Sequence, residues 1–216
     1  MDNPPSSSSA LHTLEILEKF YPEAHCALNY RNPYELLVAT ILSAQCTDIR
    51  VNQVTRGFFM DYPDISALAD ADMSGIEDRI RSTGFFRNKA RHLKECAERL
   101  QRDFNGVVPS TLEALITLPG IGRKTANVLL GNVFGIPGMV VDTHVKRISF
   151  RLGWTRHRDP DKIEKDLCRL LPAERWTQAG HVLIAHGRQL CKAPVPNCSL
   201  CPVVAACPKN GVSKHR

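Results

Sequence analysis

Four cysteines near the C-terminal end of the chain have the spacing that points most directly to chemistry. Cys191, Cys198, Cys201 and Cys207 follow the pattern C-x6-C-x2-C-x5-C and are interleaved with four prolines. The prolines keep the intervening chain in tight loops, so four thiolates can converge on one centre. Structural disulfides are disfavoured in a reducing compartment, which leaves zinc or an iron-sulfur cluster. Only one close C-x2-C pair is present, which favours a cluster without deciding the choice; four ordinary cysteines are the remaining alternative.

The second candidate is a short hairpin over residues 118–122, between two predicted helices within residues 110–135. Gly120 and Gly122 have no Cβ atom, so both can take a positive φ and let backbone N–H groups approach an anion where the second helix begins. A phosphate fits such a place, and the contact would hold a DNA strand without reading its bases. A plain helical hairpin with a glycine turn is the structural alternative.

Lys124 stands in the first turn of that second helix, where the positive end of the helix dipole costs a cation about 0.3–1 kcal/mol. A helix built only for stability would avoid a lysine there. The dipole favours the neutral amine, which is the form that attacks a carbonyl-like carbon to make a Schiff base. A solvated lysine that pairs with a phosphate is the alternative, and position alone favours it.

Asp142 stands just before another predicted helix, where its simplest role is an N-cap that accepts hydrogen bonds from free N–H groups. A carboxylate held rigidly in this way stays ionised. It could then stabilise cationic character at a sugar carbon, or steer a water or an amine. Sequence spacing alone does not bring Asp142 and Lys124 together.

The elements that must position these residues are predicted to be helices. Apolar residues recur every three or four positions, most clearly over residues 11–17 and 90–104, and no convincing strand pattern competes. The apolar run 139–141 is short and is interpreted as an extended connector. The chain is therefore predicted to be all-α. Its helix-start signals are Asn32–Pro33 before a helix over 34–45, Ser110 with Glu113 as a capping box, and Asp159–Pro160.

Composition limits the remaining possibilities. With 216 residues and 43% hydrophobic content, the chain can form one large domain or two modest ones. No segment reaches the roughly 20 apolar residues that cross a bilayer, and the first ten residues lack the features of a signal peptide, so we expect a protein without a membrane partner that stays inside the cell. The formal charge of +6 raises the expectation of an anionic partner such as nucleic acid, although it is weak evidence alone.

Four segments together closely resemble the endonuclease III family. They are L-S-A-Q-C-T-D at 42–48, L-P-G-I-G-R-K-T-A-N-V at 118–128, V-D-T-H at 141–144, and the four cysteines. The resemblance implies a helix-hairpin-helix glycosylase with two all-α domains that flank a DNA-binding cleft. Residues 26–136 would form a six-helix barrel containing the hairpin. Residues 10–25 with 137–216 would form a domain around a 4Fe-4S cluster, and residues 1–9 a flexible tail.

The resemblance also implies the roles of individual residues. Lys124 becomes the nucleophile on C1′ of the damaged nucleotide and Asp142 the essential carboxylate, while the four cysteines hold the cluster. Residues matching Gln45, Phe85 and His144 fill the vacated stack or touch the opposite base. Gln45 and His144 fit directly, whereas the better-known bacterial pattern has Leu where Phe85 is placed, which leaves opposite-base preference open.

The implied activity is that of a bifunctional DNA glycosylase and abasic-site lyase of base excision repair. It would excise oxidised pyrimidines from duplex DNA through a lysine Schiff base and cleave the strand 3′ to the abasic site by β-elimination, after the damaged base is flipped out. Abasic sites are also implied substrates. We expect a monomer that works in the bacterial cytoplasm, at the nucleoid.

Three rival functions are compatible with parts of the pattern. Adenine glycosylases lack the hairpin lysine and carry a catalytic Glu a few residues before the position of Gln45, where this chain has none. Mismatch thymine glycosylases have Tyr where Lys124 stands. A non-catalytic DNA-binding module with a redox-sensing cluster is the third rival, and the presence of both Lys124 and Asp142 disfavours it.

Overall fold

The computed structural model describes residues 5–216 and is helical throughout, with no β-strand among those residues. The chain divides into two compact units. Unit 1 combines the residues up to His25 with Pro137–Arg216, and unit 2 is Cys26–Ile136. The all-α prediction is confirmed. In the part of the chain from Pro5 onward, no helix is both long enough and apolar enough to span a membrane.

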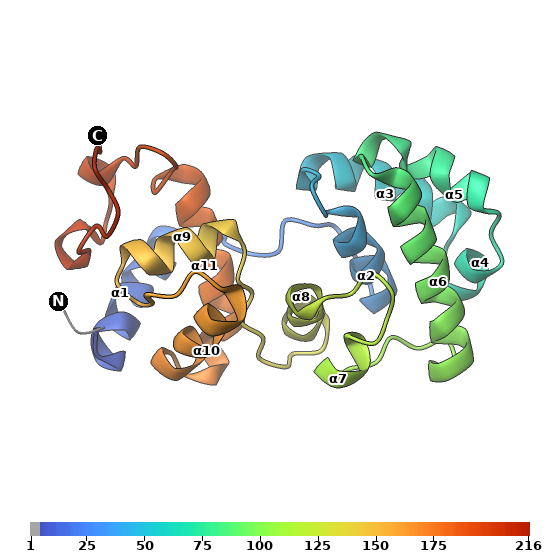
Figure 1. Ribbon diagram of the computed structural model, residues 1–216, viewed down its shortest axis with the longest axis horizontal. Coiled ribbons are helices and arrows are strands. Elements are labelled where there is room, and N and C mark those ends of the chain that lie inside the picture. The colour runs from blue at the N-terminus through green and yellow to red at the C-terminus, as the bar shows by residue number, and fades with distance from the viewer. Residues whose placement is uncertain (1–4) are drawn as a thin grey trace. The chain divides into compact units, whose positions relative to one another are not determined.

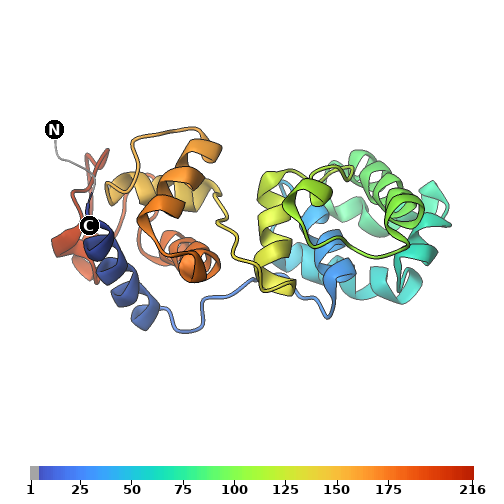
Figure 2. The same ribbon diagram turned by 90° about the horizontal axis from the view of Figure 1, so that it is seen from below.

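Unit 1 joins the two ends of the chain around one apolar core. In Figures 1 and 2, α1 (Ser7–Phe20) lies with the C-terminal helices instead of with those that follow it in sequence. The buried side chains of α1, Leu14 and Leu17 among them, join the core formed by the other helices of the unit. Those helices are α9 (Thr143–Arg151), α10 (Pro160–Leu170) and α11 (Trp176–Gln189).

The start of α1 differs from the predicted flexible tail over residues 1–9. Residues 1–4 lie outside the described part of the chain, but Ser7 to Ser9 form the first turn of α1. The hydroxyl of Ser6 accepts a hydrogen bond from the N–H of Ser9. Serine is a favoured N-cap because its oxygen satisfies a helix donor that has no other partner. The serine-rich composition therefore marks a helix start here.

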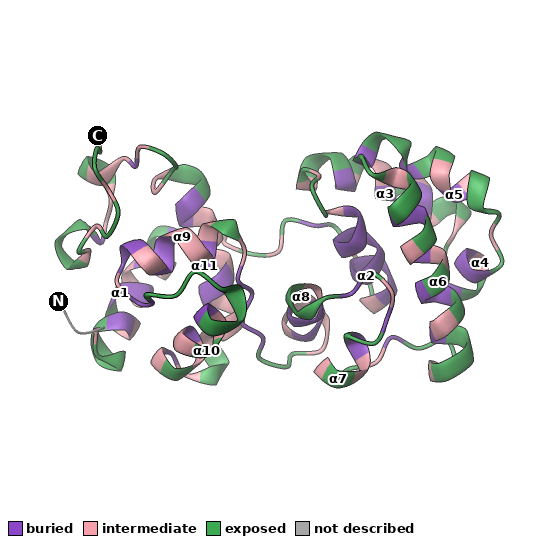
Figure 3. Ribbon diagram, in the orientation of Figure 1, coloured by how far each residue is buried: buried purple, intermediate pink, exposed green. Residues whose placement is uncertain are grey.

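Unit 2 is built around α2 (Pro33–Leu42), whose residues from Tyr34 to Leu42 are all buried, as its colouring in Figure 3 shows. A helix that is apolar on every side must be enclosed by others. The helices that follow α2 are α3 (Asp48–Asp61), α4 (Ile65–Ala69), α5 (Met73–Ile80), α6 (Phe86–Phe104), α7 (Leu112–Leu115) and α8 (Arg123–Val133). Of these, α3, α6 and α8 pack directly against α2, while α4 and α5 pack on α6.

The predicted helix-start signals are confirmed at two places and displaced at a third. The side chains of Asn32 and Asp159 accept hydrogen bonds from the first turns of α2 and α10. The helix predicted over 34–45 ends at Leu42. The capping box predicted at Ser110 is wrong by one residue, because the Thr111 hydroxyl caps α7 by accepting from the N–H of Ala114. Residues 139–141 form an extended connector, as predicted.

Candidate functional sites

The hairpin between α7 and α8 depends on Gly120. Its φ is +77°, and a Cβ atom built there would lie only 2.9 Å from Cβ of His92. Glycine is thus required for both its backbone angle and its small size. Gly122 does not share this role, because its φ is −94°. The prediction of positive φ is therefore confirmed at Gly120 and wrong at Gly122, which stands at the N-cap of α8 with open space where a Cβ would lie.

Lys124 is the second residue of α8 and is exposed. The N-cap residue Gly122 has no side chain to satisfy the first N–H groups of the helix, and no side chain caps them. An uncapped helix start beside a glycine turn leaves room for an anion. The side chain of Lys124 therefore projects from a place where a DNA phosphate can be bound by backbone groups.

Asp142 is the N-cap of α9, as predicted. Its Oδ1 accepts hydrogen bonds from the N–H groups of His144 and Val145, each at 2.8 Å. Both capping bonds use the same oxygen, and Oδ2 makes no hydrogen bond within residues 5–216. The carboxylate is thus fixed in orientation at the start of a helix.

His144, two residues further on, is half-buried and hydrogen-bonded. Its Nδ1 lies 3.1 Å from Nη2 of Arg147, and burial, with help from nearby arginines, lowers the pKa of the ring below its usual range. Arg147 donates further hydrogen bonds to the carbonyl oxygens of Gly187 and Cys191. A Cβ at Gly187 would lie 2.7 Å from Nδ1 of His144, so this glycine is what allows α11 to pack so closely on α9. No residue pattern in the sequence marks Arg147, because it acts mainly through the backbone carbonyl groups of Gly187 and Cys191.

Gln45 and Phe85 are both exposed residues of unit 2 and both have left-handed backbone angles. Gln45 has φ +52° and Phe85 has φ +49°. Left-handed backbone costs a non-glycine residue on the order of 1–3 kcal/mol and tends to occur at functional sites. Phe85 is 63% exposed directly before α6, although an aromatic side chain gains by burial. At both positions where DNA contacts were predicted, the structure therefore has a strained backbone and an exposed side chain.

The four cysteines line one cavity that lies wholly within unit 1 (residues Arg151 to Val212 contribute its walls). All four are free thiols of intermediate burial. Burial raises the pKa of Cys201 and Cys207, and the neighbouring thiols raise it further. A metal reverses this effect, because a coordinating thiol is deprotonated outright.

The donor set fits a cluster of several metal atoms. Among residues 5–216, no three His, Cys, Asp or Glu side chains are grouped closely enough to hold a single metal ion. A 4Fe-4S cluster takes one thiolate for each of its four irons, so it requires four thiols around a shared cavity instead of at one point. Cys191, Cys198, Cys201 and Cys207 satisfy that requirement.

Arg151 supports the cysteine cavity and was not found from the sequence. Its Nη1 donates to the carbonyl oxygen of Lys192 at 2.9 Å and to Cys191, both at the carbonyl oxygen and at Sγ. The carbonyl oxygen of Arg151 accepts a hydrogen bond from the thiol of Cys207. One buried arginine on α9 thus contacts the first and the last of the four cysteines. A guanidinium beside sulfur is suited to offset the negative charge of thiolates.

Comparison with known proteins identifies relatives along nearly the whole chain. Residues 38–173 match the HhH-GPD superfamily of base excision DNA repair proteins. Endonuclease III of Synechocystis is 52% identical over 92% of this chain and 91% of its own length. Endonuclease III of Bacillus subtilis is 42% identical over 90% of this chain and 89% of its own. A solved trapped covalent intermediate of an endonuclease III with DNA covers 95% of this chain and 97% of that one, with a TM-score of 0.90 and 42% identity.

Proposed function

The chain belongs to the endonuclease III family, and we propose that Lys124 and Asp142 carry out its chemistry. Members of this family are DNA glycosylases and abasic-site lyases of base excision repair, so the protein is an enzyme that binds and processes DNA. The observation that carries the residue assignment is Lys124, exposed in the uncapped first turn of α8 directly after the glycine hairpin.

Lys124 acts as the nucleophile in this proposal. Its neutral Nζ attacks C1′ of the damaged nucleotide, the glycosidic bond breaks, and the base leaves with the bonding electron pair and takes up a proton. Loss of a proton from Nζ leaves the closed sugar joined to the protein by a single C1′–Nζ bond. The C1′–O4′ bond then breaks, O4′ takes up a proton, and the lone pair of Nζ forms the C1′=Nζ double bond of a protonated imine. Removal of a proton from C2′ then breaks the C3′–O bond, which is β-elimination 3′ to the lesion. The N–H groups of the hairpin would hold a backbone phosphate and fix the strand.

Asp142 acts through its charge. As the base leaves, the sugar becomes cationic around C1′, and a fixed carboxylate stabilises that charge without having to reorganise. The two N–H donors on Oδ1 hold the carboxylate in a fixed orientation. The proposal requires Asp142 and Lys124 to act on the same nucleotide.

Oxidised pyrimidines and abasic sites in duplex DNA are the proposed substrates, processed by a monomer at the bacterial nucleoid. Gln45, Phe85 and His144 would occupy the stack that the flipped base leaves or contact the opposite base. Phe85 supports this role because an exposed ring can stack on any base.

The cysteine cavity is proposed to hold a 4Fe-4S cluster on Cys191, Cys198, Cys201 and Cys207. When bound, such a cluster supplies a cross-link among the C-terminal loops and a redox-active centre. Arg151 orients Cys191 through its bonds to the carbonyl oxygen and Sγ of that residue. The cluster would thereby also stabilise α9, whose first turn carries Asp142 and His144.

Borohydride trapping tests the nucleophile. Wild-type protein incubated with abasic-site DNA and borohydride should form a stable covalent complex, because the imine is reduced to an amine. Lys124→Gln should abolish the complex while DNA binding persists, since glutamine still forms hydrogen bonds but has no nucleophilic amine. Arg123→Gln, the neighbouring exposed cation, is the matched control and should still be trapped.

The same experiment can contradict the proposal. If wild-type protein releases thymine glycol from duplex DNA but leaves no trapped complex, then water is the nucleophile and Lys124 has another role. Trapping by Lys124→Gln at the wild-type rate would assign the imine to a different amine.

A further inference from the structure

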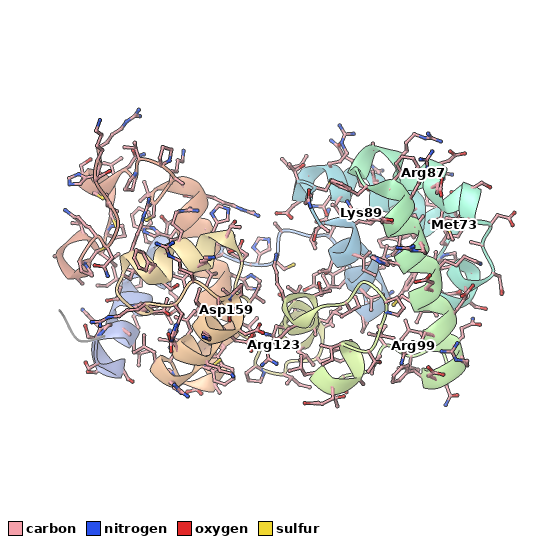
Figure 4. All side chains as sticks on the ribbon, viewed as in Figure 1. Met73, Arg87, Lys89, Arg99, Arg123 and Asp159 are labelled. Carbon is pink, nitrogen blue, oxygen red and sulfur yellow. The ribbon has the colours of Figure 1, made fainter. Side chains whose placement is uncertain are left out.

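Lys89 is a buried lysine that the reaction described above does not use. Lys89 is the fourth residue of α6, is 4% exposed, and is labelled in Figure 4. Its Nζ donates hydrogen bonds to the carbonyl oxygens of Leu42 and Thr83, each at 2.8 Å. Lysine is rarely fully buried without a specific partner, because removing an ammonium from water is costly. Its retention in the core of unit 2 therefore calls for a reason beyond packing.

The two carbonyl groups belong to two different loops. Leu42 is the last residue of α2, and its carbonyl oxygen is one that the helix cannot satisfy itself. The negative end of the α2 dipole lies at the same place and favours a cation there. Thr83 ends the short 3-10 turn Arg81–Thr83, and its own hydroxyl is bonded to Ile80. Lys89 is thus the shared anchor of both loops.

Each of these loops leads at once to a strained, exposed residue. Gln45 follows Leu42 by three residues, and Phe85 follows Thr83 by two. Both have left-handed backbone angles, which persist only when the surrounding structure holds them. The backbone N–H of Lys89 also bonds to the carbonyl oxygen of Phe85 at 3.1 Å. One residue therefore fixes the bases of both loops and the start of α6.

We propose that Lys89 is a positioning residue that makes Gln45 and Phe85 act on DNA as a single unit, by holding the Leu42 and Thr83 carbonyl groups on one ammonium. This inference rests on the proposed function, in which those two side chains enter the base stack. Without the shared anchor each loop moves separately, so insertion of one side chain into the base stack no longer favours insertion of the other. Burial lowers the pKa of Lys89, as expected for an ammonium that gives up water for two carbonyl groups.

The chain supplies a matched control on the same helix. Lys94 also donates two hydrogen bonds to backbone carbonyl oxygens, those of Ala69 and Ala71, each at 2.8 Å. These groups lie at and just beyond the end of α4, next to no residue with a proposed DNA contact. Lys94→Met removes the same kind of anchor from the same unit. It therefore measures the effect of lost stability alone.

The first test compares Lys89→Met with Lys94→Met on two substrates. Lys89→Met should slow single-turnover excision of thymine glycol from duplex DNA by about 10–100-fold. Borohydride trapping on abasic-site DNA should change by less than about 3-fold, because that site has no base to unstack. Lys94→Met should leave both rates within about 3-fold of wild type, and Lys89→Arg, which keeps a charged donor, should restore most of the excision.

A double-mutant cycle tests the coupling itself. In the wild-type background, the fold-loss in excision of the Gln45→Ala/Phe85→Ala double mutant should differ from the product of the two single-mutant losses by about 5-fold or more. Coupled residues typically show a difference of roughly 2–150-fold. In the Lys89→Met background, the double-mutant loss should equal the product of the two single-mutant losses. If Lys89→Met does not fold, the cycle is repeated in Lys89→Gln, whose shorter amide cannot span both carbonyl groups.

The outcomes separate the two proposals. If wild-type protein neither excises thymine glycol nor forms the trapped complex, the proposed function fails and this inference with it. If wild type is active but the coupling survives in the Lys89 variants, or Lys94→Met shows the same selective loss of excision, then Lys89 is a core residue only and the inference is overturned.

Discussion

The two units support their candidate functional residues in different ways. In unit 2, Gln45, Phe85 and Lys124 are exposed at loops and helix starts above a closed apolar core. In unit 1, Asp142 and His144 are only half-exposed and are held by hydrogen bonds. Those bonds lead through Arg147 on to the loop that begins at Cys191.

The difference shows which interactions stabilise each unit. The core of unit 2 is mostly apolar, and its two buried charged side chains, Glu35 and Lys89, have hydrogen-bond partners within the unit, so packing and these bonds can keep its loops in place. In unit 1 a group of arginines and thiols lies between α9 and the C-terminal loops. Such polar interiors stabilise a fold only when every member is satisfied. We therefore expect the stability of unit 1 to depend on the proposed 4Fe-4S cluster and that of unit 2 to be independent of it.

Two cysteine variants should give the largest contrast. Cys198→Ser removes one proposed cluster ligand, and because metal-binding free energy is part of the folding free energy, most of the iron and much of the folded yield should be lost. Cys96→Ser changes a buried thiol of unit 2, whose pKa burial raises to about 12, and should retain the roughly four irons expected per chain. Iron analysis of natively purified protein measures both. Stoichiometric zinc without iron would contradict the cluster.

Asp142→Asn should cost the next-largest effect, about 10²–10³-fold in excision, which is typical for removing one electrostatic stabiliser. Asparagine caps helices about as well as aspartate, so the melting temperature should change little. Asp159→Asn alters an equivalent N-cap of α10 in the same unit and should keep full activity. Single-turnover rates and thermal melts would show the difference. Similar excision rates for both variants would show that Asp142 acts only as a helix cap.

Phe85→Ala should weaken binding to lesion duplexes by about 1–3 kcal/mol more than to undamaged DNA, because a ring beside the flipped base offsets lost stacking. Phe20, which is 48% exposed on α1 in unit 1, supplies the control. Phe20→Ala should leave the ratio of the two affinities unchanged. Binding measured at one fixed salt concentration decides the matter. Equal losses on both duplexes would show that Phe85 serves packing only.

We expect the smallest effect from acid, which should lower the free energy of unfolding of unit 1 through His181. Burial, helped by His25, lowers the pKa of His181 below 6.5. The unfolded chain therefore binds the proton more readily, and this contribution to stability is complete above about pH 6.5 and lost as pH falls from there toward the lowered value. His181→Gln should make the loss of urea stability between pH 7.5 and 5.5 smaller without abolishing it, because burial also lowers the pKa of His186, to about 4. The exposed His12, replaced by Gln, is the control.

Much of the architecture could be predicted because the signals are local. Asn32, Asp159 and Asp142 cap their helices through N–H groups two or three residues away, so a short sequence window contains the whole interaction. The errors are also local. Ser110 and Thr111 are chemically interchangeable as caps, and glycine permits a positive φ at Gly122 without requiring it.

The sequence by itself determined the helical class, the hairpin with its lysine, and the four thiols, because each is defined by residue types at fixed short spacing. Only the tertiary structure decided that Gln45 and Phe85 are left-handed and that Lys89, Arg147 and Arg151 hold loops together. The partners of those cations are backbone carbonyl groups up to 47 residues away. Every residue carries a carbonyl group, so no residue type marks which one a buried charge will bind.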